Sequence, residues 1–306
     1  MLVIQAIDEF LLYLDIEKKC SPNTIQGYTK DLLLFNEYLK EFRQDLDIAN
    51  ITRATVRRFV QYQMVHKHSS SRSMNRRISS LRSFTKFCLL EKYISDDFMA
   101  TIERPKINTP LPIYMNLQEL QQLFLSLEHE AFGGSYLSIR NHFLFKFIAL
   151  TGTRRQEVCD LTWKQFDLMN QTVRIRGKGN KERLLPLHPT LLPLIHAYKD
   201  VLKPFLTHSN LNVFYNHHYH SIDPRGLHKV FKEVLKKAGL DPKRFSLHHL
   251  RHTFATLMLQ ENGENIDLRV LQDFLGHESL ATTSIYTHVD FKQKQKAINT
   301  FLSSKT

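Results

Sequence analysis

Apolar residues recur at helical spacing close to the start of the chain. Ile7, Phe10 and Leu14 fall on one face of a helix that we expect to begin near residue 4. Ser21 and Pro22 then supply an N-cap and a proline that the first turn of a helix tolerates. A second helix is therefore predicted from this point to about residue 39.

Two further helices are predicted before residue 100. Thr52 precedes one over residues 53–65, and the serines at 69–71 precede another that reaches about residue 92. At 100° per residue, one side of this fourth helix is predicted to pack and consists of Met74, Ile78, Leu81, Phe84, Thr85 and Cys88. The opposite side carries Arg72, Arg76, Arg82 and Lys86.

A proline-rich stretch separates this helical region from the rest of the chain. Residues 104–112 contain Pro105, Pro110 and Pro112, which prevent a helix from continuing and favour an extended linker. We therefore predict a helical domain at 1–104, a linker at 105–112 and a second domain at 113–306. Asn116 and Glu119 have the spacing of a capping box at the start of that second domain.

The second domain combines helices with a short hairpin. Residues 142–152 form a strongly apolar segment that predicts a buried helix, and residues 227–238 and 247–301 are also expected to be largely helical. The runs at 172–176 and 183–187 suit strands, and the turn between them presents Lys178. The predicted fold is mainly α, with an N-terminal helical domain and a C-terminal mixed α/β domain that holds a small sheet.

Composition indicates a folded protein with a polyanionic partner. The chain has 306 residues, 42% of them apolar, and a formal net charge of +12. Because phosphates release counterions when Lys or Arg neutralises them, nucleic acid is the first candidate, although ribosome-associated and membrane-surface proteins share this charge balance. No acidic residue occurs between Ile51 and Leu90. The candidate DNA contacts in this segment are Arg53, Arg57, Arg72, Arg76, Arg82 and Lys86, and the alternative is a solvated basic surface.

Neither a metal site nor a membrane anchor is predicted. Cys20, Cys88 and Cys159 lie far apart and are interpreted as reduced packing cysteines, which suits a cytoplasmic protein. The first residues lack the pattern of a secretion signal, and no stretch is apolar enough to span a bilayer. The histidines at 217, 218 and 220 lack nearby cysteine or carboxylate partners, so we interpret them as loop residues.

Five short motifs in the second domain resemble the signature blocks of one enzyme family. They occupy residues 151–157 (TGTRRQE), 177–183 (GKGNKER), 248–252 (HHLRH), 275–277 (LGH) and 286–288 (YTH). In this order they resemble tyrosine site-specific recombinases of the phage integrase family, in the Xer-like and transposon-resolvase branch. The resemblance covers essentially the whole chain and implies a SAM-like core-binding domain followed by a tyrosine recombinase catalytic domain.

The residue types in these motifs suit the breakage and rejoining of a phosphodiester. Arg154 and Arg251 can each donate two parallel hydrogen bonds to phosphate oxygens, which gain charge in the transition state, and His277 would add a donor. Tyr286 is the predicted nucleophile, with His248 as the preferred base.

The departing 5′ oxygen needs a proton, which Lys178 at the hairpin tip can supply as general acid. The resemblance implies the same roles, and it also implies that Glu157 orients Arg154. The mechanism needs no metal, cofactor or ATP, because the arginines neutralise the phosphate and the covalent link conserves the bond energy.

The resemblance also implies partners. They are double-stranded DNA with inverted-repeat core sites and further copies of the chain, arranged as a dimer on each site and a tetramer in synapsis. The apolar stripe after Tyr286 suits a helix that docks on its own domain or, as the resemblance implies, on a neighbouring protomer; it comprises Phe291, Ala297, Ile298, Phe301 and Leu302.

Other interpretations remain open from the sequence alone. Each candidate residue, taken singly, has an ordinary explanation, such as a hairpin-turn lysine for Lys178 or a C-cap histidine for His277. A type IB topoisomerase-like or telomere-resolving enzyme would use the same nucleophile. A catalytically silent DNA-binding regulator could share the fold.

Overall fold

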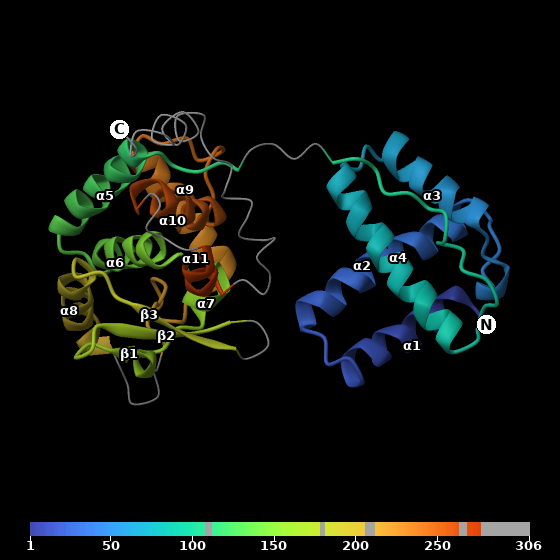
Figure 1. The fold of residues 1–306 in the computed structure, drawn as a ribbon, viewed down its shortest axis with the longest axis horizontal. Helices are drawn as coiled ribbons and strands as arrows, with labels where there is room; N and C mark the ends of the chain where they lie inside the picture. Colours follow the sequence, from blue (N-terminus) through green and yellow to red (C-terminus); the bar gives the residue numbers. More distant parts are fainter. Residues whose placement is uncertain (108–111, 178–180, 206–211, 263–267, 277–306) are drawn as a thin grey trace, which may run out of the picture. The chain divides into compact units, whose positions relative to one another are not determined.

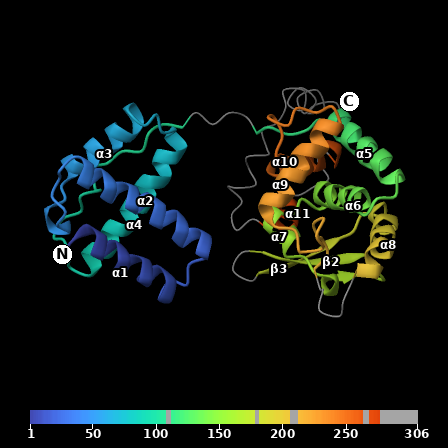
Figure 2. The ribbon, with the colours of Figure 1, turned by 180° about the vertical axis from the view of Figure 1, so that it is seen from behind.

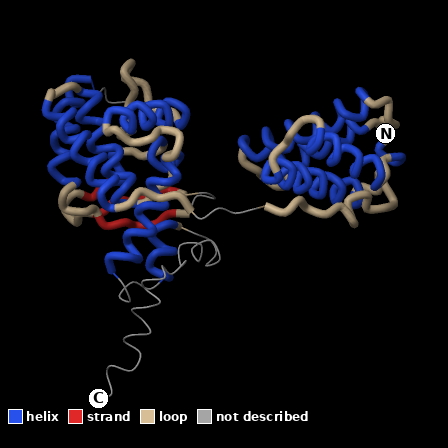
Figure 3. Tube along the Cα trace, turned by 90° about the horizontal axis from the view of Figure 1, so that it is seen from above, coloured by secondary structure: helices blue, strands red, loops and turns tan. Residues whose placement is uncertain are grey.

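The computed structural model describes residues 1–306 except 108–111, 178–180, 206–211, 263–267 and 277–306 (Figure 1). Contacts within the chain divide it into two compact units, residues 1–110 and residues 111–306. Among the described residues, β-strand occurs only in the second unit (Figure 3). The mainly helical fold with a small sheet, predicted from the sequence, is confirmed.

The first unit is built from α-helices, three of which start at the predicted caps. They are α1 (Val3–Ile16), α2 (Pro22–Glu41), α3 (Arg53–Val65) and α4 (Ser71–Leu90), with a short 3₁₀ turn at Ile48–Asn50. The side chains of Ser21, Thr52 and Ser70 accept hydrogen bonds from backbone N–H groups three residues later. These bonds satisfy donors that the first helical turn leaves without partners, so α2, α3 and α4 begin directly after their capping residues.

The core of the first unit is aromatic. Phe10, Phe35, Phe59 and Phe84 are all at most 1% exposed and come from the four helices α1 to α4. The packing side predicted for α4 is also buried, including both Thr85 and Cys88. The helical periodicity of this segment therefore placed its core side correctly.

The second unit combines a small antiparallel sheet with helices. Its strands are β1 (Phe166–Asp167), β2 (Thr172–Arg176) and β3 (Glu182–Pro186), in the order β1-β2-β3. Its helices are α5 (Leu117–Phe132), α6 (Tyr136–Thr151), α7 (Arg155–Cys159), α8 (Leu191–Leu202), α9 (Pro224–Lys237), α10 (Leu247–Asn262) and α11 (Leu268–Leu275). Helix α6 is buried and packs against α5, α8 and α10 (Figures 1 and 2).

The second unit follows the sequence prediction at its start and in its hairpin. Asn116 and Glu119 form the expected capping box, with reciprocal bonds of 2.8 and 2.9 Å between side chain and backbone. Strands β2 and β3 pair as expected, and Arg176 lies opposite Glu182. Strand β3 begins one residue earlier than predicted, at Glu182.

Other elements differ from the prediction for local reasons. Helix α6 begins at Tyr136, before the predicted residue 142, because Ser135 caps it by accepting from the amide of Ser138. Helix α8 was not predicted; Pro193 lies in its first turn, where the missing N–H costs no hydrogen bond. Strand β1 has only two residues, which is too short for any periodicity to be visible.

The predicted helical region 247–301 is described only up to residue 276. Helices α10 and α11 cover much of that part, and Gly276 follows α11 with a left-handed φ of 58°. The remainder of the predicted region lies outside the described residues. None of the described helices combines the length and apolarity that a membrane crossing needs.

Candidate active site

The candidate site begins at the sharp turn that ends α6. Gly152 has φ 60°, and its amide donates to the Ile148 carbonyl at 3.0 Å. A Cβ at this position would lie 2.5 Å from Cδ1 of Phe254, so only glycine fits both the backbone angle and the space. Because of this turn, Arg154 lies at the N-cap position of α7.

Glu157, in the first turn of α7, fixes Arg154 by hydrogen bonds. Its Oε2 accepts from the backbone amide of Arg154 at 2.8 Å, and its Oε1 accepts from Nη1 of Arg154 at 2.9 Å. The Glu157 side chain is 5% exposed, whereas the Arg154 side chain remains 39% exposed. The guanidinium group is thus fixed from the protein side while part of it faces outward.

The Glu157 carboxyl is ionised in this setting. Burial by itself raises its pKa, but hydrogen bonds and positive charge from Arg183 and Arg154 outweigh burial and leave the pKa below its usual value. The carboxylate therefore keeps its acceptor capacity for both arginines at neutral pH.

Arg251 reaches the same region from α10. It is 2% exposed, its Nη1 donates to the Gly152 carbonyl at 2.5 Å, and its Nη2 donates to the Leu275 carbonyl at 2.6 Å. Nη2 of Arg154 donates to the next carbonyl, that of Gly276, at 2.8 Å. The structure therefore brings two guanidinium groups together at the C-terminal end of α11, although about a hundred residues separate them in sequence.

His248 lies one helical turn before Arg251 on α10. Its ring contacts His252 edge to face, with centroids 4.3 Å apart. Burial lowers the pKa of the His248 imidazole, and the charges of Arg251, His249 and Arg154 lower it further, in that order. The ring is therefore neutral at pH 7 and able to accept a proton.

The neighbouring His249 has a different environment. Its Nδ1 lies 2.9 Å from the Arg244 carbonyl oxygen and 3.3 Å from the Ser246 amide, at the start of α10. This nitrogen is engaged by the local backbone. Of the two adjacent histidines, His248 is the one whose pKa responds to both Arg154 and Arg251.

Three predicted catalytic residues, Lys178, His277 and Tyr286, lie outside the described residues. Lys178 belongs to the loop between strands β2 and β3, which are both described. The Gly177 amide donates to the Lys181 carbonyl at 2.7 Å at the base of this loop. The chain passes directly from Gly276 into His277.

The predicted DNA contacts in the first unit fall into two groups. Arg53, Arg57, Arg72 and Lys86 are exposed. Arg76, whose side chain is 53% exposed, and the half-buried Arg82 have partners within the unit. Arg76 forms an ion pair with the buried Asp31 at 2.6 Å, and Arg82 donates to the Ile102 carbonyl at 2.5 Å.

Sequence reasoning gave no role to Arg183, which the structure places inside the site. Its side chain is 7% exposed, and its two terminal nitrogens donate to the two oxygens of Glu157 at 2.9 and 2.7 Å. Residues of a strand alternate between its faces, so Arg183 shares a face with the buried Leu185. The sequence feature that could have pointed to Arg183 is an arginine at a strand position that alternation places on the buried face.

Comparisons with known proteins identify the family. The model of the phage integrase family matches residues 114–293, and that of the phage integrase N-terminal SAM-like domain matches residues 7–92. This chain belongs to the phage integrase family.

Relatives of this phage integrase family member cover almost its whole length. Tyrosine recombinase XerD of Staphylococcus epidermidis is 34% identical over 297 residues, which are 96% of this chain and 97% of the relative. Tyrosine recombinase XerC of Halalkalibacterium halodurans is 35% identical over 291 residues, 93% of each chain.

A solved structure agrees with this assignment. The XerH site-specific recombinase bound to palindromic difH substrate, in a post-cleavage complex, has a TM-score of 0.72 and 26% identity. The match covers 93% of this chain and 81% of the XerH chain. The chain is therefore a tyrosine recombinase by family, fold and relatives.

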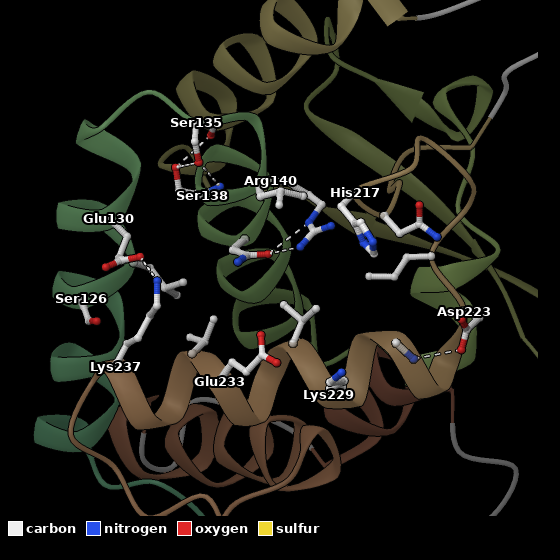
Figure 4. Close-up of a pocket in the computed structure, with 18 residues that line it drawn as sticks. Ser126, Glu130, Ser135, Ser138, Arg140, His217, Asp223, Lys229, Glu233 and Lys237 are labelled. Carbon is white, nitrogen blue, oxygen red and sulfur yellow. Dashed lines mark hydrogen bonds and ion pairs between the residues drawn. The ribbon is translucent and has the colours of Figure 1, made fainter.

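This phage integrase family member also has a cavity of about 580 Å³ between α5, α6 and α9 (Figure 4). The buried Arg140 extends toward His217 there, and it donates to the Tyr215 carbonyl at 2.7 Å and to the Asn141 side chain. Lys237 pairs with Glu130 at the other end of the cavity. Arg154, His248 and Arg251, the predicted catalytic residues that the structure describes, are not among those that line it.

Proposed function

We propose that this chain cleaves and rejoins DNA at specific sites with the residues that the sequence singled out. Two guanidinium groups, Arg154 and Arg251, meet at the end of α11, and this convergence is the observation that carries the proposal. Forked donors around one phosphate favour the transition state, because its non-bridging oxygens carry more charge than those of the ground state.

The chemical step is a transesterification. The phenolic oxygen of Tyr286 attacks phosphorus and forms a 3′-phosphotyrosyl bond, while the bond from phosphorus to the 5′ oxygen breaks. The phenolic proton passes to His248, whose neutral imidazole can accept it, and Lys178 protonates the departing oxygen. His277 donates a hydrogen bond to the phosphate. Attack by a 5′ hydroxyl reverses the step, so rejoining needs no ATP.

The two units have different tasks in this proposal. The SAM-like first unit binds core-site DNA through its exposed basic residues, and the second unit performs the chemistry. Recombination between two duplexes breaks four strands, and each chain offers one Tyr286. Four protomers on two inverted-repeat sites, two on each site, therefore form the active assembly. We place the protein in the cytoplasm, where DNA is accessible and the free thiols of Cys88 and Cys159 stay reduced.

The proposal is tested with suicide DNA. A site is first selected from random-sequence duplex by binding to the full-length protein, and a nick is then placed so that the cleaved fragment diffuses away. The wild-type chain is expected to form a covalent protein–DNA adduct. Tyr286→Phe is expected to bind the same DNA with unchanged affinity and to form no adduct. A wild-type chain that binds without an adduct, or an adduct that persists in Tyr286→Phe, would contradict the proposal.

A further inference from the structure

Arg183 uses all three nitrogens of its guanidinium group inside the second unit. Nη1 and Nη2 donate to the two oxygens of Glu157, and Nε donates to the Phe274 carbonyl at 2.9 Å. The Glu157 carboxylate is consequently shared between Arg183 on one side and Arg154 on the other. Two parallel hydrogen bonds fix the plane of a carboxylate, whereas a carboxylate held by a single hydrogen bond can still rotate.

The C-terminal end of α11 joins three arginines from different elements. Its successive carbonyls at residues 274, 275 and 276 accept from Arg183 of β3, Arg251 of α10 and Arg154 at the start of α7. Carbonyls at a helix C-terminus lack helical partners and carry partial negative charge. They are therefore good acceptors for cationic donors, and they tie three elements to one place.

Gly276 provides the space for this arrangement. It has φ 58°, and a Cβ there would lie 3.1 Å from Nη1 and 3.3 Å from Cδ of Arg183. The side chain of Arg183 thus lies directly against the turn that follows α11. His277, the next residue in the chain, is one of the predicted catalytic residues.

We propose that Arg183 is a positioning residue for strand cleavage, which aligns Arg154, through Glu157, with the end of α11. Because Arg183 belongs to β3, it also anchors the base of the hairpin that carries Lys178. The inference rests on the proposed function, since cleavage is the reaction being positioned. Arg183 does not touch the phosphate in this scheme; it acts only through Glu157 and the backbone.

A purely stabilising role is the alternative. Removing one partner of a buried ion pair costs stability, because the remaining charge loses its compensation, whereas a substitution that keeps the positive charge avoids most of this cost. Misplacing a catalytic group by about 1 Å, in contrast, can cost about 100-fold in rate without a comparable loss of stability. The two roles therefore differ in which measurement responds. Positioning predicts slower cleavage in a variant that folds and binds DNA normally.

Arg183→Lys is the first variant, because it keeps the charge but cannot donate two parallel bonds. We expect it to melt close to the wild-type temperature and to bind the selected DNA equally well. Its single-turnover adduct formation at saturating DNA should be slower by about 10- to 100-fold. The matched control is Arg176→Lys in the same hairpin, where Arg176 is 66% exposed and pairs with Glu182 at 2.8 Å. The control should cleave at the wild-type rate.

Arg183→Met adds a pH readout. The charged groups that face Glu157 in the described part of the chain are Arg154 and Arg183, so removing one of them while burial persists raises the pKa of the carboxyl. The rate of Arg183→Met relative to wild type should then fall as the pH is lowered from 8 to 5. Adding Glu157→Gln in the same background should remove that additional pH dependence.

The outcomes separate this inference from the proposed function. A wild-type chain that forms no adduct overturns both. A wild-type chain that cleaves normally together with Arg183→Lys at an equal rate overturns the positioning role alone. The inference is also overturned if both variants lose rate only in proportion to a lower melting temperature and the rate of Arg183→Met relative to wild type does not change with pH. Arg183 would then be a stabilising residue only.

Discussion

Nη2 of Arg154 lies 2.8 Å from the carbonyl oxygen of Gly276, a residue 122 positions further along the chain. This bond joins the first of the recombinase motifs to the fourth through the backbone. The orientation of the guanidinium group therefore depends on where α11 ends, and the identity of residue 276 matters through its φ and its small size.

Glu157→Gln should damage both stability and cleavage. The buried carboxylate accepts from two arginines, and an amide offers one acceptor oxygen and places an NH₂ group against the other guanidinium. We expect the free energy of unfolding to fall by about 2–4 kcal/mol and cleavage to slow in the fraction that stays folded. Urea unfolding and single-turnover kinetics measure the two effects. Unchanged stability would contradict the shared ion pair.

Gly152→Ala should destabilise the second unit. The added Cβ would meet the Phe254 ring at 2.5 Å, and the left-handed backbone adds strain, so a loss of about 2–5 kcal/mol is expected. Gly27→Ala in α2 is the matched control, because a Cβ there meets nothing within 4 Å. Alanine suits a helix interior better than glycine, so the control should gain about 0.5–1 kcal/mol. Equal effects at both positions in thermal unfolding would refute the argument.

The pH dependence of cleavage should report the lowered pKa of His248. A general base works when it is deprotonated, and this imidazole loses its proton at a lower pH than the usual value of about 6.5. The rate should thus be level near pH 7 and fall only in more acidic solution. Single-turnover rates between pH 5 and 9 measure the profile, and His248→Gln should be slow and lack this acidic limb. A wild-type midpoint above pH 7 would argue against His248 as the base.

Arg72 and Arg76 should contribute differently to DNA binding. Arg72 is exposed and makes no ion pair with a described residue, so Arg72→Gln should reduce the slope of log affinity against log salt by about 0.9. Arg76 is already neutralised by the buried Asp31, so Arg76→Gln should change this slope less and should lower the free energy of unfolding by about 1–3 kcal/mol. Gel-shift titrations at several salt concentrations distinguish them, and equal slope changes would count against the distinction.

Truncation after His288 should weaken assembly more than binding to a single site. The removed segment contains the apolar stripe of residues 291–302, which a short helix needs to bury against a partner. Gel shifts on one-site and two-site DNA should show lost cooperativity with retained affinity for one half-site. Cooperativity equal to that of the full chain would indicate that the segment docks on its own protomer.

Features with a local cause were the ones that the sequence predicted well. Caps such as Ser21 and Asn116 act within three residues, and the packing side of α4 follows from one helical period. These patterns need no knowledge of the tertiary fold.

Features with a distant cause were not predictable in the same way. The charge run of α4 appeared free of carboxylates because Asp31, the partner of Arg76, lies 45 residues earlier on α2. Likewise, the role of Arg183 depends on Glu157, 26 residues away, and on the end of α11. The motif spacing grouped Arg154 with Arg251, but only the fold reveals the carbonyls that orient them.

The buried residues of the two units form separate clusters, one within residues 3–102 and the others within residues 115–275. Among the residues that the structure describes, no buried side chain belongs to the clusters of both units, so a substitution that reshapes one of these cores leaves the other intact. The first unit can therefore diverge in sequence while the packing beneath Arg154 and Arg251 in the second unit stays the same.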